Sequence, residues 1–104
     1  GGYVRKATAM FYYIKGPLIL ATPNTAVVDA GGVGYKMTVS ENTYRSLPPR
    51  HTVDKPPVVT LYTYLSVRED GVELFGFGDE RELSSFKMLI SVSIRIYHRK
   101  IIKR

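Results

Sequence analysis

The chain has 104 residues, no cysteine and a formal net charge of +6. This length suits a single domain that can bury a core without crosslinks, and the lack of cysteine excludes disulfides and thiolate chemistry. No apolar run approaches the roughly 20 residues needed to cross a bilayer, and no signal peptide is visible. We therefore expect one domain without a membrane segment.

The positive charge is concentrated at the two ends. Residues 1–9 carry a net +2 and residues 94–104 a net +5, whereas residues 10–93 hold eight basic and nine acidic side chains. The central segment therefore has no strong overall attraction for phosphates. We expect residues 1–9 to be a leader sequence, because Met10 is a plausible natural start. Residues 94–104 form an atypical basic tail that could continue a helix, form a short strand or stay disordered.

The first half of the central segment predicts short strands with turns between them. Met10–Lys15 and Leu18–Ala21 are apolar stretches, and we expect the Gly16-Pro17 pair to break the chain between them. Thr25–Ala30 predicts another strand, and the glycines that follow it supply the permissive backbone of a tight hairpin. Residues 35–39 then alternate between apolar and polar, which is typical of a half-buried strand.

A short helix and two more strands follow. Glu41–Leu47 predicts the helix, with Ser40 as its N-cap and two prolines ending it. Val58–Val67 and Val72–Phe77 predict strands, and Asp70-Gly71 between them is a strong two-residue hairpin signal.

The last element is predicted to be a helix that starts at Asp79. Asp79 is a good N-cap, and Glu82 three residues later suggests a capping box. Apolar residues recur at helical spacing, so one face should be buried. That face comprises Leu83, Phe86 and Ile90, and Leu89 lies beside it.

These elements predict an all-β (mainly β) fold class. A five-stranded Greek-key barrel of the oligonucleotide/oligosaccharide-binding (OB) type fits the size, the short helix after strand 3 and the C-terminal helix. We expect residues 10–78 to form the barrel and residues 79–93 to add the helix to the same domain.

No catalytic, cofactor or metal site is predicted. His51 and His98 have no partner pattern for a metal or a triad, so we interpret both as solvated. The Gly31–Gly34 run lacks the ending and context of a phosphate loop. Glu69 and Asp70 lie together at the predicted hairpin tip. Two interpretations are open: a functional cluster of negative charge, or an ordinary solvated turn.

Tyrosines are frequent on the predicted strands, and two interpretations are open. Exposed tyrosines on an OB barrel can stack on single-stranded bases. Core or subunit contacts would also explain them, and the near-neutral central segment favours this second interpretation. The tyrosines concerned are Tyr12, Tyr13, Tyr35, Tyr62 and Tyr64.

Four sequence blocks in order resemble the first domain of the RuvA family. They are Gly31–Tyr35, Val67–Gly71, Leu74–Phe77 and Phe86–Ser93. Each block alone is weakly specific, but their order and spacing make the resemblance specific across Met10–Ser93.

The resemblance implies a non-catalytic OB domain that assembles homotetramers. The family is bacterial and cytoplasmic, and its tetramer is a platform for Holliday junction DNA in branch migration, recombination, repair and the SOS response. The resemblance implies that Glu69 and Asp70 form an acidic pin at the junction centre. The alternative is an independent OB domain that binds single-stranded nucleic acid.

The similarity stops after Ser93. The family continues there with a Gly-Val-Gly-Pro-Lys stretch that opens a DNA-gripping helix-hairpin-helix domain, whereas this chain has Ile94-Arg95-Ile96-Tyr97. The family's contacts with its ATP-hydrolysing partner RuvB, and with RuvC, involve regions that this chain mostly lacks. We therefore expect this chain alone to bind junctions weakly and not to recruit the motor.

Overall fold

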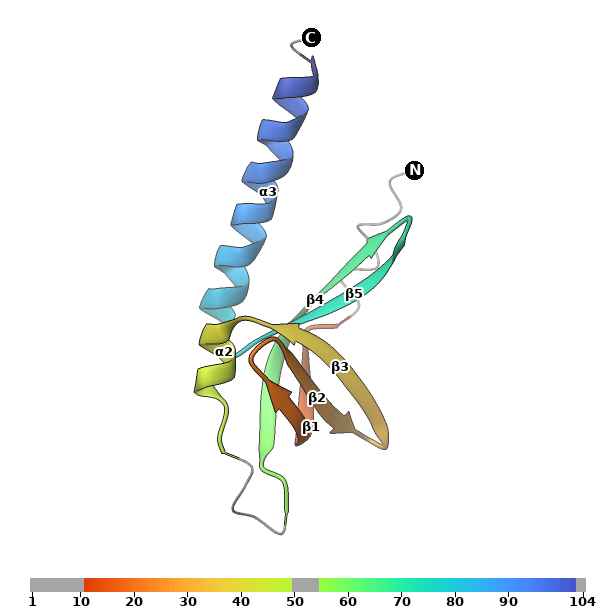
Figure 1. Ribbon diagram of the computed structural model, residues 1–104, viewed down its shortest axis with the longest axis vertical. Coiled ribbons are helices and arrows are strands. Elements are labelled where there is room, and N and C mark those ends of the chain that lie inside the picture. The colour runs from red at the N-terminus through yellow and green to blue at the C-terminus, as the bar shows by residue number, and fades with distance from the viewer. Residues whose placement is uncertain (1–10, 50–54, 103–104) are drawn as a thin grey trace.

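The computed structural model describes residues 11–49 and 55–102, with side chains described up to Ser93. The elements in this part of the chain are β1 (Tyr13–Thr22), β2 (Thr25–Ala30), β3 (Val33–Val39), α2 (Glu41–Ser46), β4 (Val58–Arg68), β5 (Gly71–Phe77) and α3 (Glu80–Ile102) (Figure 1). The predicted five strands, the short helix after the third strand and the last helix are confirmed. The helix α3 continues past Ser93 to Ile102. Of the three alternatives for the basic tail, the helical one is therefore observed for residues 94–102.

The five strands close into a barrel with the neighbour order β1, β2, β3, β5, β4, and β4 pairs again with β1. All pairs are antiparallel except β3 with β5. This strand order is that of a five-stranded Greek-key OB barrel, so the predicted fold class is confirmed.

The predicted break at Gly16-Pro17 is wrong, because β1 is one continuous strand. Its first half, Tyr13–Pro17, pairs with β4, and its second half, Leu18–Thr22, pairs with β2. The Gly-Pro pair therefore lies where the strand changes partner, a position that tolerates a proline without an N–H group. A Cβ on Gly16 would lie 2.1 Å from the carbonyl oxygen of Asp29 on β2, so this close approach requires glycine.

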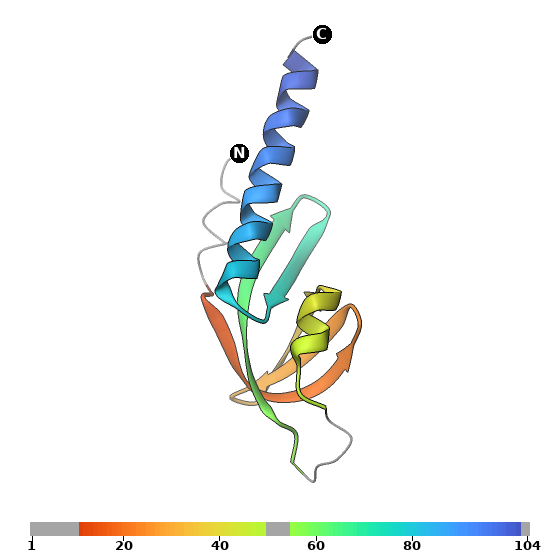
Figure 2. The same ribbon diagram turned by 90° about the vertical axis from the view of Figure 1, so that its left-hand side faces the viewer.

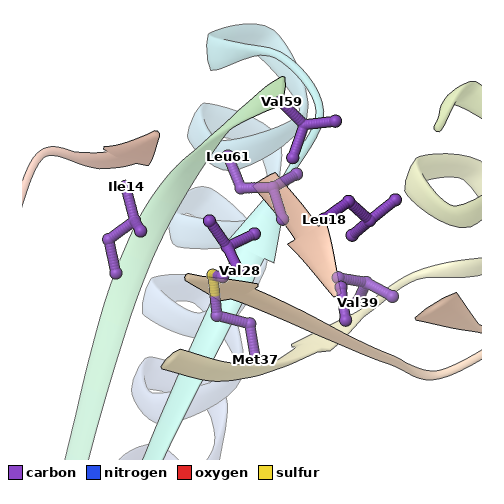
Figure 3. Packing of buried hydrophobic residues seen from close by; sticks show 8 residues of the cluster. Ile14, Leu18, Val28, Met37, Val39, Val59 and Leu61 are labelled. Carbon is purple, nitrogen blue, oxygen red and sulfur yellow. The ribbon is translucent and has the colours of Figure 1, made fainter. Parts of the chain in front are cut away.

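The barrel core is made by inward-facing residues from β1 to β4. Cross-strand partners meet there, as when Ile14 faces Leu61 and Leu18 faces Val28 (Figure 3). Because successive residues of a strand alternate between its two faces, their neighbours face outward. The buried cluster consists of Ile14, Leu18, Ala26, Val28, Met37, Val39, Val59 and Leu61.

Both helices begin at the predicted N-caps. The Ser40 hydroxyl accepts the N–H of Thr43 at 3.0 Å, and Asp79 Oδ1 accepts the N–H of Glu82 at 2.8 Å. Each bond satisfies one of the unpaired N–H groups of a first helical turn.

The helix α3 packs against the barrel only near its start. Leu83 is buried and Phe86 and Ile90 are partly buried, as predicted, but Leu89 is 66% exposed. Leu89 lies beside this face and is turned to solvent. After its first turns the helix leaves the barrel and projects beyond it (Figure 2). Within the described part of the chain, no helix is long and apolar enough to span a bilayer.

The hairpin of β4 and β5 also extends beyond the barrel. The pairing of β1 with β4 ends at Tyr62, and β3 pairs only with Phe75 and Gly76 of β5. Four further residue pairs, Leu65–Arg68 with Gly71–Leu74, have no other strand neighbour in the described sheet. We call these eight residues and the two turn residues between them the arm. The arm and α3 leave the barrel on the same side (Figure 1).

Candidate functional site

The tip of the arm presents Glu69 and Asp70, as the sequence pattern predicted for the two carboxylates. Arg68 pairs directly with Gly71, so Glu69 and Asp70 are the two turn residues, and both are exposed. The predicted hairpin is confirmed, but its two turn residues are Glu69 and Asp70 instead of Asp70 and Gly71, because Gly71 is already the first residue of β5, with φ 152°. The pairing of β5 with both β4 and β3 in the barrel determines the register of the hairpin. The preference of Asp-Gly for the two turn positions does not.

The tip is negatively charged overall. Three carboxylates and one guanidinium lie on it, from Glu69, Asp70, Glu73 and Arg68, which gives a net charge of −2. Arg68 Nε lies 3.7 Å from Asp70 Oδ1, and Arg68 Nη2 lies 3.5 Å from Glu73 Oε1. The side chain of Asp70 is 86% exposed, so solvent screens its ion pair. Among the described residues, Glu69 has no ion-pair partner.

An aromatic cluster supports the base of the arm. The ring of Phe86 on α3 lies 5.0 Å from the rings of Phe75 and Phe77 and 5.6 Å from that of Tyr64. Phe75 and Phe77 lie on the same face of β5, and their rings and that of Tyr64 all contact Phe86. A pocket of about 190 Å³ lies beside this cluster, lined by Thr38, Val39, Ser40, Phe75, Phe77 and Phe86. The cluster joins α3 to the strands from which the arm projects.

A hydrogen-bond network joins α2 to the start of α3. One carboxylate oxygen of Glu82 accepts the Ser40 hydroxyl at 2.5 Å, and the other accepts the Thr43 hydroxyl at 2.6 Å. Thr43 Oγ1 also accepts the N–H of Gly78 at 3.0 Å. The carboxylate of Glu82 thus bonds to Ser40 and Thr43 at the start of α2. In the predicted capping box it would instead have bonded back to Asp79. Sequence spacing could not reveal this role, because the partners lie about forty residues apart.

Three tyrosines form a second, partly exposed surface at the start of β1 and on β4. The ring centroids of Tyr12, Tyr13 and Tyr62 lie between 5.9 and 6.2 Å apart in edge-to-face contacts. Tyr12 is 61% and Tyr13 52% exposed, so neither is a core residue. Tyr35, in contrast, packs against the barrel core. A core position therefore holds for Tyr35, whereas for Tyr12 and Tyr13 base stacking and subunit contacts are the two interpretations left open.

The remaining candidate residues lie outside the described regions or bring no ligands together. Residues 1–10, the loop residue His51 and the side chain of His98 are not described. Within residues 11–49 and 55–102, no cluster of three or more histidine, aspartate or glutamate residues could hold a metal ion.

Two residues that the sequence pattern did not single out, Thr38 and Glu73, contact the tip or its neighbours. Thr38 Oγ1 donates to Glu73 Oε2 at 2.8 Å, and Glu73 also contacts Arg68. The sequence contained one indication of the role of Glu73. It lies on the same face of the strand as Phe75 and Phe77, and a carboxylate on such an apolar face requires a polar partner.

Comparison with known proteins agrees with this geometry. The RuvA N terminal domain family matches residues 10–76. A Holliday junction branch migration complex subunit RuvA from Chlorobium phaeobacteroides is 45% identical over 84 residues, which cover 81% of this chain and 40% of the relative.

Two further relatives carry the same description. The protein from Chlorobium limicola is 46% identical over 81 residues, which cover 78% of this chain and 37% of the relative. The protein from Caldanaerobacter subterraneus is 42% identical over 84 residues, which cover 81% of this chain and 42% of the relative. This chain thus spans about 40% of the length of these relatives. The barrel, the acidic hairpin and these matches place the chain in the RuvA N-terminal domain family.

Proposed function

We propose that this chain is a non-catalytic assembly and platform domain for Holliday junction DNA in branch migration. The observation that supports the proposal most directly is the arm, which carries Glu69 and Asp70 away from the barrel on a two-residue turn. In a fourfold assembly, four such tips would gather at the centre. Their carboxylates would repel phosphates near the crossover and help keep the strands apart while bases exchange partners. The domain would guide DNA without changing it covalently.

The proposed platform requires that several copies of this chain assemble, so molar mass is the first measurement. We expect this chain to approach four times its 11.7 kDa mass in light scattering as its concentration increases. A constant monomer mass into the millimolar range would mean that residues 11–102 do not carry the information for assembly. The tip carboxylates would then have no central ring to form, and the platform proposal would fail for this chain.

The role of the tip carboxylates can be measured by DNA binding at low salt. Glu69→Gln together with Asp70→Asn should raise the affinity for a fluorescent four-way junction about three- to tenfold, because two phosphate-repelling charges are removed per subunit. The affinity for linear duplex of equal length should change much less, because a duplex has no crossover at the centre of the platform.

A matched control removes the same number of charges elsewhere. Glu41→Gln with Glu80→Gln alters α2 and the start of α3, which lie away from the tip (Figure 1). If this control raises junction affinity as much as the tip variant does, the effect is one of net charge and the acidic-pin role is wrong.

A second function is favoured by the exposed tyrosine surface, Tyr12, Tyr13 and Tyr62. Stacking on a base contributes about 1–3 kcal/mol per aromatic side chain. The strands β1 and β4 that carry this surface contain Lys15 and Arg68 but no carboxylate, so they do not repel a phosphate backbone. The same titration with a fluorescent single-stranded oligonucleotide separates the two functions, because binding of a single strand to the tyrosines would not respond to the tip carboxylates.

A further inference from the structure

We propose that Glu73 is a positioning residue which, anchored on Thr38, holds Arg68 beside Asp70 and so fixes the direction of the acidic tip. This inference rests on the proposed function of the tip, and it adds a residue that the family resemblance did not supply.

The arm needs such a support because, beyond the packing of Leu74 against the barrel core at its base, it has little to hold it. Its four residue pairs, Leu65–Arg68 with Gly71–Leu74, have no lateral strand in the described sheet. An isolated two-stranded hairpin is only marginally stable in water. The aromatic cluster around Phe86 supports the base of the arm, at Tyr64 and Phe75, and so ends before the arm begins.

A continuous series of polar contacts runs from the barrel to the tip. It starts at Thr38 on β3, whose hydroxyl donates to Glu73 Oε2 at 2.8 Å. The other oxygen of Glu73 lies 3.5 Å from Arg68 Nη2, and Arg68 Nε lies 3.7 Å from Asp70 Oδ1. Both oxygens of Glu73 are thus engaged, one toward the barrel and one toward the tip.

Glu73 is the best placed of the charged residues to act as this support. Its side chain is 38% exposed, compared with 61% for Arg68 and 86% for Asp70. Its interactions are therefore screened least by solvent. A planar guanidinium can bridge two carboxylates, so Arg68 transmits the position of Glu73 to Asp70. A charge that is held in place before DNA arrives needs no further ordering when it acts.

Nuclear magnetic resonance relaxation on the whole 104-residue chain, without DNA, tests this role. Two variants interrupt the series: Thr38→Val removes the anchor without changing any charge, and Glu73→Gln removes the ion pair with Arg68. We expect either variant to lower the order parameters of the Glu69–Gly71 amides from about 0.8 to below about 0.6, with the barrel amides unchanged. The Arg68 Nε–H group should lose order in parallel.

Salt and a control variant separate positioning from general stabilisation. At about 1 M NaCl, where the Debye length is about 3 Å, Arg68 in the parent chain should become as mobile as in Glu73→Gln, which should itself respond little. Glu41→Gln breaks the exposed ion pair with Arg45 and should leave the tip unchanged.

Unchanged order of Arg68 and of the tip in Glu73→Gln overturns the inference. Equal losses of order in Glu41→Gln overturn it as well. Neither result affects the acidic-pin proposal, which depends on junction affinity and is measured separately. Conversely, an ordered tip that does not influence junction binding would leave the support intact and remove the proposed function.

Discussion

Gly16→Ala should lower the free energy of unfolding by about 3 kcal/mol, and the melting temperature by about 12–24 °C. The added Cβ would lie 2.1 Å from the Asp29 carbonyl oxygen and 2.9 Å from its carbon. Both of these atoms are backbone, so the clash cannot be relieved by a change of rotamer. The strands β1 and β2 would have to separate where β1 passes from β4 to β2. Chemical denaturation followed by circular dichroism measures the loss.

Gly34→Ala is the matched control for that substitution. It adds the same methyl group to β3, and there the new Cβ meets only the side chain of Val27, at an ordinary 3.6 Å. We expect a change smaller than about 1 kcal/mol, since the backbone at Gly34 is not among those with positive φ. Equal losses in both variants would show that the close approach at Gly16 is not the cause.

Thr43→Val should cost about 3 kcal/mol, although it replaces one side chain by another of nearly the same shape. Thr43 is 1% exposed, and its hydroxyl serves two partners, the carboxylate of Glu82 and the N–H of Gly78. Valine leaves both partners without this bond in a site from which water is largely excluded. The loss should appear as a lower midpoint in urea with an unchanged slope.

Thr63→Val tests the same argument with the opposite sign. Thr63 is 2% exposed on β4, and its hydroxyl has no hydrogen-bond partner in the described part of the chain. Removing it should leave stability unchanged or raise it by about 1 kcal/mol. A large loss at both threonines would mean that β-strand and helix packing, rather than hydrogen bonding, determines the effect at Thr43.

The local features of the fold could be predicted because local chemistry determines them. Thr25–Ala30 was predicted to its observed ends, and the turn after it requires positive φ at Gly31 and Gly32, which are 64° and 91°. The N-caps Ser40 and Asp79 were also predictable, since each satisfies an N–H group three residues away. The position of Glu69 and Asp70 at a hairpin tip followed from the strand and turn pattern, and the structure places both in the turn.

The features that failed depend on contacts between distant segments. Gly16-Pro17 looks like a break in the sequence, and only the change of strand partner shows why β1 continues through it. Glu82 has the spacing of a capping box, but its partners are on another helix. The link between Thr38 and Glu73 spans 35 residues, so no local pattern could contain it.

Because β4 and β5 pair only with each other beyond the barrel, the length of the arm is independent of the barrel that carries it. A strand rises about 3.4 Å per residue and its side chains alternate between faces. Inserting two residues into each strand would move the tip outward by about 6.8 Å with every side chain still on its original face, whereas inserting one into each would exchange the faces. The distance of the carboxylates from the barrel can therefore change, with their faces kept, only in steps of two residues per strand, or about 6.8 Å.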